Sequence, residues 1–188
     1  YSLDFLGKFN KAKKPLFAQK IQVDESKHKE YLENEEKLNE IYEDCRSIDS
    51  KFTEIKSSET KLNNIISQLN PWLSLNENLE DIGATKNTNT ILGFIAGKYE
   101  EELIAAVNAE DLHAYLVKVG AEKENSFFMV TYHKTCEEKI AQLLKQAGWT
   151  KVTFSEYSGT PKDNVERLKS EINELENIKK ELVKKAEA

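Results

Sequence analysis

Apolar residues recur at alternating three- and four-residue steps in two stretches, one on each side of a segment that lacks this period. The first stretch covers about residues 25–69, and the second runs from Val165 to Leu182. Such a sustained period is typical of coiled-coil helices, because it places one apolar seam along each helix. We therefore expect a chain that runs out along one helix, builds a lobe and returns along a second, antiparallel helix. The seam residues are Leu38, Ile41, Cys45, Ile48, Phe52, Ile55, Leu62, Ile66 and Leu69, and then Val165, Leu168, Ile172, Leu175 and Leu182.

Local signals predict where both helices begin and end. Asp24 or Ser26 is expected to cap the first helix, and Pro71 to end it, because proline disfavours the α conformation in the residue before it. Thr160, followed by a proline and by Asp163, is expected to start the second helix. At 1.5 Å per residue, the first helix would measure about 68 Å and the second about 39 Å.

The difference in length leaves part of the first helix, near residues 31–41, without a partner from the second. Three partners are possible: residues 1–20, a second copy of the chain, or sequence outside the given chain. We favour the last, because the chain begins at Tyr1 and stops at Ala188 within a predicted helix, as a piece of a longer protein would.

The segment between the two helices predicts alternating strands and helices in the order β-α-β-β-α-β. With short connections, the compact solution is a four-stranded antiparallel sheet with both helices on one face. The expected fold class is α+β, a ferredoxin-like lobe inserted between two long antiparallel coiled-coil helices. We expect strands at 90–96, 112–119, 126–133 and 151–154, with a turn at 120–125. A first helix is expected at 98–108, and its buried residues would be Tyr99, Leu103, Ile104 and Val107. A second helix is expected to begin at a capping box of Thr135 and Glu138 and to end at Gly148, and its buried residues would be Ile140, Leu143, Leu144 and Ala147.

These elements divide the chain into four expected parts. Residues 1–23 form a short helix and a linker, 24–70 the outgoing helix, 71–159 the lobe with its connector, and 160–188 the return helix. Trp72 is expected to anchor the connector.

Composition excludes several classes of function. The net charge is −6, with Lys and Glu interspersed, so the surface does not resemble one that neutralises phosphates, and nucleic-acid binding is not expected. No apolar run approaches the roughly 20 residues that cross a bilayer. The two cysteines, Cys45 and Cys136, have no paired framework, so no disulfide is expected.

No catalytic, metal or cofactor site is expected either. His133 and Cys136 have the spacing of metal ligands, but tetrahedral zinc needs two more ligands and none lies nearby. Cys45 falls on the helical seam, where it would be buried filler. The single glycine before Thr160 is not a phosphate loop, which needs several glycines followed by Lys-Ser or Lys-Thr.

One surface of the lobe is a candidate binding site. If both helices cover one face of the sheet, strand alternation places five semi-polar and aromatic residues on the other face. A composition of this kind is common in recognition patches, although polarity alone does not mark an interface, and the face could instead meet water or the coiled coil. The five residues are His113, Tyr115, Thr131, His133 and Thr153.

Several short sequences occur in an order that resembles the cytoplasmic N-terminal region of V/A-type ATPase subunit I, the counterpart of the V-ATPase a subunit. They cover most of the chain and lie between and beside the two helical seams. The sequences are Phe5-Leu6, Lys13-Lys14-Pro15-Leu16-Phe17, Pro71-Trp72-Leu73-Ser74-Leu75, Thr85-Lys86-Asn87-Thr88, Gly93 in the first strand, Tyr132-His133-Lys134, and Gly159-Thr160-Pro161.

The resemblance implies a function that the composition does not show. Members of this family are stator subunits of rotary ATPases that move protons or sodium ions. Their distal lobe meets a peripheral stalk of E and G subunits, which resists torque, and a separate C-terminal domain lies in the membrane. This chain would then be a non-catalytic distal-lobe fragment on the cytoplasmic side of the membrane. The alternative is a coiled-coil arm whose ferredoxin-like module binds a ligand or associates with itself.

Overall fold

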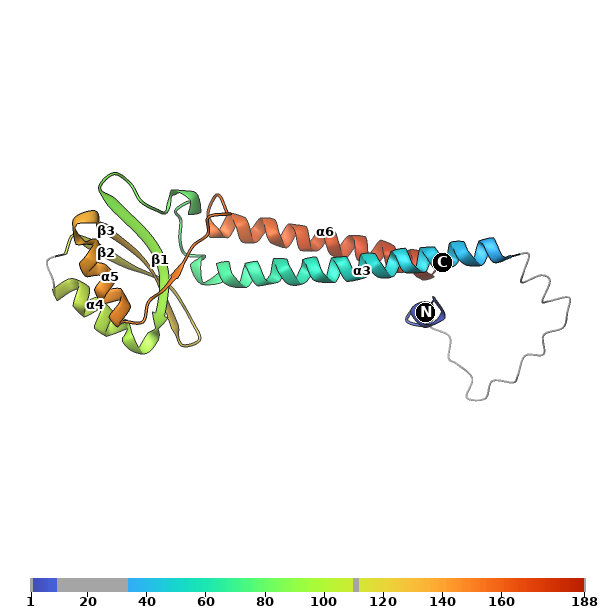
Figure 1. The fold of residues 1–188 in the computed structure, drawn as a ribbon, viewed down its shortest axis with the longest axis horizontal. Coiled ribbons are helices and arrows are strands. Elements are labelled where there is room, and N and C mark those ends of the chain that lie inside the picture. Colours follow the sequence, from blue (N-terminus) through green and yellow to red (C-terminus); the bar gives the residue numbers. More distant parts are fainter. Residues whose placement is uncertain (1, 10–33, 110–111, 188) are drawn as a thin grey trace. The chain divides into compact units, whose positions relative to one another are not determined.

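The structure is a computed structural model that describes residues 2–9, 34–109 and 112–187 (Figure 1). The chain divides into two compact units, which are described separately. The helical unit consists of Tyr1–Lys61 and Glu171–Ala188, and the sheet unit of Leu62–Ser170. Both divisions fall inside a helix, because the long helices α3 (Glu35–Leu69) and α6 (Pro161–Glu187) each contribute to both units.

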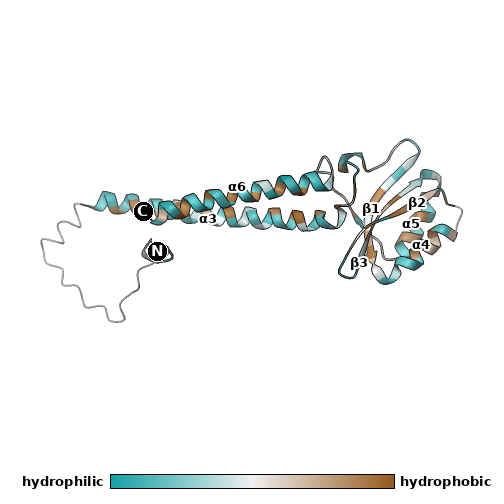
Figure 2. Ribbon diagram, turned by 180° about the vertical axis from the view of Figure 1, so that it is seen from behind, coloured by the Kyte–Doolittle hydropathy of each residue, from teal (hydrophilic) through white to brown (hydrophobic). Residues whose placement is uncertain are grey.

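In the helical unit, α3 and α6 pack against each other along their apolar seams. Cys45 and Ile48 are buried together, and Leu182 and Ala186 of α6 pack against them. Ile55 of α3 is also buried, with 6% of its surface exposed. Lys185 Nζ of α6 lies 2.9 Å from Asp44 Oδ1 of α3. The seam predicted from the heptad spacing is therefore confirmed in this unit from Cys45 onward, and most other helical residues are hydrophilic (Figure 2).

The first residues of the chain pack on the same seam. Helix α1 (Ser2–Leu6) buries Phe5 beside Cys45, and the ring of Phe9 stacks on Phe52 at a centroid distance of 5.7 Å. Leu38 and Ile41, which the heptad spacing also placed on the seam, are 54% and 43% exposed. The predicted helix start at Asp24 or Ser26 lies outside the described residues, and what covers the seam before Cys45 stays a prediction.

The sheet unit contains a four-stranded antiparallel sheet in the order β2-β3-β1-β4. Strand β3 is the partner of both β1 and β2, and β1 also pairs with β4. This order is that of a ferredoxin-like β-α-β-β-α-β fold, as predicted. The strands are β1 (Thr88–Ala96), β2 (Ala114–Glu122), β3 (Asn125–His133) and β4 (Thr150–Val152).

Helices α4 (Glu100–Ala109) and α5 (Glu137–Gln146) lie on one face of the sheet (Figure 1). Leu103 of α4 and Ile140 of α5 are buried with side chains of the two central strands. The remaining members of this cluster are Ile95, Val107, Phe128, Val130, Tyr132 and Leu144. None of the helices in the described ranges carries an apolar stretch long enough to cross a bilayer.

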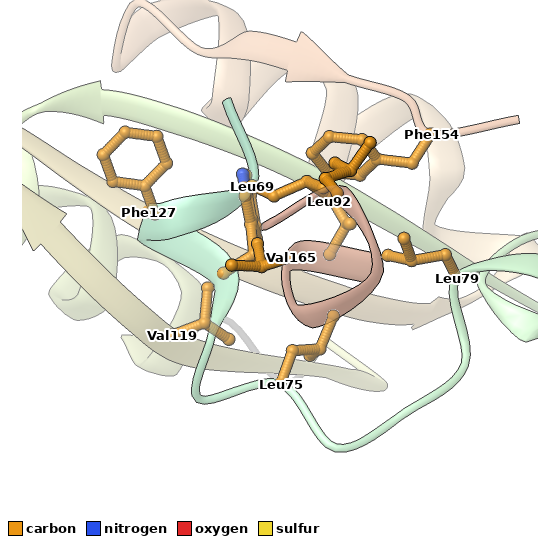
Figure 3. Close-up of a cluster of buried hydrophobic side chains, with 10 residues drawn as sticks. Leu69, Leu75, Leu79, Leu92, Val119, Phe127, Phe154 and Val165 are labelled. Atoms are coloured by element: carbon orange, nitrogen blue, oxygen red, sulfur yellow. The ribbon is translucent and has the colours of Figure 1, made fainter. Parts of the chain in front are cut away.

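The opposite face of the sheet is covered over much of its area, which agrees with the alternative in which this face meets the coiled-coil helices. Trp72 of the 3-10 turn η1 (Asn70–Trp72) packs edge-on against Phe127 and Phe154. The end of α3 and the start of α6 join them (Figure 3). The buried members of this cluster, here called the aromatic core, are Leu69, Trp72, Leu75, Leu79, Leu92, Val119, Phe127, Phe154, Val165 and Leu168.

The start of α6 has the cap that the sequence predicts. Thr160 Oγ1 donates to Asp163 Oδ2 at 2.7 Å, and the Asp163 backbone N–H donates to Thr160 Oγ1 at 3.1 Å. This reciprocal pair satisfies helix-end donors that would otherwise lack partners. It also holds the pKa of the Asp163 carboxyl below its usual range, because both Thr160 hydrogen bonds favour the ionised form.

Several predicted boundaries differ from the structure. The predicted turn at 120–125 is shorter, because β2 continues to Glu122 past a bulge between Lys118 and Gly120. Only two residues reverse the chain, and Lys123 adopts a left-handed φ of 55° there. Strand β4 ends at Val152 rather than at Phe154, whose ring turns into the aromatic core.

The predicted starts of both lobe helices were wrong in detail. A 3-10 turn precedes each, and the side chain of His133, not a capping box of Thr135 and Glu138, accepts the Thr135 backbone N–H. Tyr99 and Ile104 are also more exposed than predicted, at 37% and 36%. Gly148, with a φ of 71°, follows α5 as predicted.

Gly93, in the middle of β1, leaves room for the indole ring of Trp149. A Cβ atom here would lie 2.6 Å from the Thr150 carbonyl oxygen and would overlap the Trp149 ring. We therefore expect Gly93→Ala to lower the free energy of unfolding by about 1–3 kcal/mol, the usual cost of overpacking. Urea denaturation followed by circular dichroism measures this loss. Gly83→Ala is the control, since a Cβ there would meet nothing within 4 Å, and equal losses in both variants would contradict the prediction.

Candidate interaction surface

Strand register places four of the five predicted site residues on one face of the sheet. Tyr115 pairs with Thr131, and the backbone N–H of His133 donates to the carbonyl oxygen of His113 at 2.9 Å. Because side chains alternate along strands, Tyr115 shares a face with Thr131 and His133, and His113, directly before β2, lies beside His133. This face is the one opposite α4 and α5, beyond the edge of the aromatic core.

Thr153 does not belong to this group. It follows the end of β4, which is the opposite edge strand from β2, so two strands separate it from Tyr115. Its neighbours Val152 and Phe154 both pack in the aromatic core. The predicted set of five is therefore corrected to four residues that lie together and one that lies apart.

Two threonines of β1 complete the surface, and the sequence analysis missed them. Thr90 Oγ1 lies 3.0 Å from Thr131 Oγ1, and Thr88 pairs with His133. The signal was the alternation of Thr88-Asn89-Thr90, which places both hydroxyls on one face at the start of the strand. We call the resulting patch the hydroxyl surface; it consists of Thr88, Thr90, His113, Tyr115, Thr131 and His133.

Tyr115 is the most exposed large side chain of the hydroxyl surface. This side chain is 70% exposed, more than any other large hydrophobic or aromatic residue in the described part of the chain. At the end of β3, the Thr135 hydroxyl lies 2.8 Å from His133 Nδ1, and Lys134 Nζ donates to the Thr85 carbonyl oxygen at 2.6 Å. An exposed aromatic ring on a polar surface suits protein recognition better than chemistry.

Residues 34–109 and 112–187 contain no group of three or more His, Cys, Asp or Glu side chains placed to hold a metal ion. Cys45 is buried in the helical unit, as the seam predicts, and Cys136 is partly buried beside Thr135. His133 uses its Nδ1 atom for the local bonds at the end of β3.

No protein-family model and no curated protein matches this chain. Among solved structures, the chain is similar to the crystal structure of the cytoplasmic N-terminal domain of subunit I, homolog of subunit a, of V-ATPase. The TM-score is 0.53, and the sequence identity is 13%. The similarity covers 99% of this chain. The chain has the fold of that subunit I domain.

The subunit I fold confirms two expectations from the sequence, namely the resemblance, at the level of fold, and the α+β class. The chain spans 58% of the length of the subunit I structure that it matches. At 13% identity the similarity concerns fold alone, so the role of the hydroxyl surface rests on its own geometry.

A second polar cluster, outside the hydroxyl surface, ties the start of α4 to the sheet. The Glu100 carboxylate accepts hydrogen bonds from Lys118 Nζ at 2.7 and 2.8 Å and from Ser126 Oγ at 2.5 Å. The bonds from Lys118, and then from Ser126, hold the pKa of Glu100 below its usual range.

This cluster predicts a pH dependence of stability. Because the pKa of Glu100 is lower in the folded than in the unfolded chain, ionised Glu100 stabilises the fold above the ordinary value of 4.5, and this contribution disappears as the pH falls through the folded value. We expect Glu100→Gln to be less stable than the unsubstituted chain near neutral pH, and the difference to shrink below pH 4.5. Urea denaturation across this range measures it. The same substitution at exposed Glu101 is the control, and a difference that stays constant in acid would contradict the prediction.

Proposed function

We propose that this chain is part of a non-catalytic stator component of a rotary V/A-type ATPase that moves protons or sodium ions. The observation that carries the proposal is the subunit I fold over 99% of the chain. The order of short sequences from Phe5-Leu6 to Gly159-Thr160-Pro161 supports it independently of the fold. In this proposal the chain lies on the cytoplasmic side of the membrane, and membrane contact belongs to a C-terminal domain of the longer protein.

The proposed mechanism is mechanical. In this proposal the outgoing helix belongs to residues 24–70 and the return helix to residues 160–188. The distal lobe with its connector is formed by residues 71–159, and residues 1–23 precede these parts. The seam packing of Cys45 and Ile48 against α6 supports the role of the paired helices, because interdigitated seams resist bending better than single helices.

We assign the docking of the peripheral stalk, made of E and G subunits, to the hydroxyl surface. Tyr115 would be the central contact, since exposed tyrosines contribute large, rigid and amphipathic area when a partner covers them. Thr90, Thr131 and the two histidines would supply hydrogen bonds around it.

Binding of the purified chain to an E–G heterodimer tests this assignment. Isothermal titration should detect a complex, and Tyr115→Ala should weaken it about tenfold or more, as truncation of a central aromatic contact does. Tyr99→Ala is the matched control: Tyr99 is also exposed, but it lies at the start of the α4 region on the other face of the sheet. Equal effects of the two variants would reject the hydroxyl surface, and absence of any complex would reject stalk docking by this lobe.

The second candidate function is self-association, which the open edge of β2 favours. Ala114 to Lys118 lie on the outer strand of the sheet, and among the described residues the cover of this edge lies on the later part of β2, where Ser74 Oγ donates to the Val119 carbonyl oxygen. Exposed edge strands pair readily with other strands. A mass that doubles with concentration in light scattering, without E and G subunits, would favour this function over stalk docking.

A further inference from the structure

The turn formed by residues 85–88 leads into β1 and is closed by its own hydrogen bonds. The Thr85 backbone N–H donates to the Thr88 carbonyl oxygen at 2.8 Å, and the Thr88 backbone N–H donates to Thr85 Oγ1 at 3.1 Å. The two threonine hydroxyl oxygens lie 2.7 Å apart. Lys86 and Asn87 form the tip of this turn, and both are exposed. Hydrogen bonds between the two ends of a four-residue turn restrict the conformations of its tip residues.

The end of β3 holds this turn from the side. Lys134 Nζ donates to the Thr85 carbonyl oxygen at 2.6 Å, and the Lys134 backbone N–H donates to the Asn87 carbonyl oxygen at 2.9 Å. Beside them, Asn89 Nδ2 donates to Tyr132 Oη at 3.0 Å. Two of the short sequences that carry the resemblance are therefore in direct contact, although 49 positions separate Thr85 from Lys134.

The 85–88 turn continues the hydroxyl surface. Thr88 belongs to both, and its hydroxyl contacts that of Thr85 on the turn. A second pair of hydroxyls on this surface, those of Thr90 and Thr131, lies 3.0 Å apart. The six side chains of the hydroxyl surface include no carboxylate, and Lys86 adds a positive charge beside them. A partner that covers both regions is therefore complementary in charge if it presents carboxylates above the turn.

We propose that the 85–88 turn is a second contact region for the peripheral stalk and that Lys134 is its positioning residue. In this arrangement Tyr115 meets an apolar part of the stalk, and Lys86 meets a carboxylate of an adjacent acidic segment. Lys134 acts without touching the partner, because its two hydrogen bonds hold the turn at the end of β3. This inference rests on the proposed stator function and deepens it by naming the chemistry that the stalk presents.

Charge reversal at the tip tests the contact with an E–G heterodimer. Isothermal titration of the full chain should show binding about threefold or more weaker for Lys86→Glu, because two carboxylates then face each other at an exposed contact. Lys145→Glu is the matched control, since it makes the same change of net charge at an exposed position of α5, on the other face of the sheet. Equal losses in both variants would show a general effect of net charge and would overturn the contact.

Lys134→Met tests the positioning role, because methionine keeps an unbranched side chain and removes the ammonium donor. In the chain alone, amide hydrogen exchange of Thr85 and Thr88 should become about threefold faster, as expected for one lost hydrogen bond. Binding to the E–G heterodimer should weaken by a similar factor. Lys134→Arg retains a cationic donor and should restore both properties, whereas Lys145→Met removes a surface charge elsewhere and should change neither.

The two measurements separate failure of this inference from failure of the stator proposal. Unchanged exchange in Lys134→Met would show that Lys134 does not hold the turn. Faster exchange with unchanged E–G binding would overturn the turn as a contact region and would leave docking through Tyr115 intact. Absence of a complex with the unsubstituted chain would reject stalk docking itself, and the second contact region with it.

Discussion

Trp72→Ala is expected to lower the free energy of unfolding by about 3–5 kcal/mol, the usual cost of truncating a buried tryptophan. Only 1% of the Trp72 surface is exposed, and its ring packs edge-on against Phe127 at 5.4 Å and Phe154 at 5.9 Å. The truncation would therefore leave a cavity at the centre of the aromatic core, where the end of α3, the start of α6 and the sheet meet.

Urea denaturation followed by far-ultraviolet circular dichroism measures this loss without depending on tryptophan fluorescence. Leu73→Ala is the matched control, since Leu73 is the next residue and 41% of its surface is exposed. Its loss should stay below about 1 kcal/mol. If Trp72→Ala lost no more stability than Leu73→Ala, Trp72 would not hold the connector on the sheet.

Gly120→Ala should have the next largest effect, because the turn before Trp72 lies directly on Gly120. A Cβ atom on Gly120 would overlap the Pro71 carbonyl oxygen and would lie 3.2 Å from the Pro71 carbonyl carbon. These are backbone atoms, so no side-chain rotation relieves the overlap, and either β2 or the turn must move. We expect a loss at the upper end of the usual overpacking range, about 3 kcal/mol.

The melting temperature of the variant checks this expectation. It should fall by about 10 °C or more, since 1 kcal/mol shifts the midpoint of a domain of this size by roughly 4 °C. A melting temperature equal to that of Gly83→Ala would mean that the turn and β2 separate without cost, and that the covering of this sheet face is weak.

Periodic patterns predicted the elements of this chain accurately. The seam residues Ile48 and Ile55 are buried, and the end of α3 before Pro71 and the start of α6 at Pro161 match the local signals. The helical period, the proline that ends α3 and the Thr160 cap of α6 each depend on residues close together in the chain. The sequence therefore contains all that is needed to predict these helices and their ends.

Predictions that depend on contacts between distant residues were less accurate. The sequence left open whether the second face of the sheet meets water or the helices, because no local signal shows where a connector packs; in the structure Trp72 and the helix ends cover much of it. Thr153 does not lie with the other four predicted site residues, because it follows β4, which is at the opposite edge of the sheet from β2, and strand order is a tertiary property. The capping box at Thr135 failed because the ring of His133, fixed by the end of β3, takes the same backbone donor.

The sequence alone determined the two helical seams, the strand and helix order of the lobe and the cap of α6, because side-chain periodicity and backbone preference are local properties. Only the tertiary structure decided the register that joins Tyr115 to Thr131 and Thr88 to His133. It also decided the close approach of Pro71 to Gly120. These features depend on the order of the strands and on how side chains from distant segments pack together. In addition, the bulge in β2 shifts which of its side chains face each side of the sheet, and residue spacing does not reveal such a bulge.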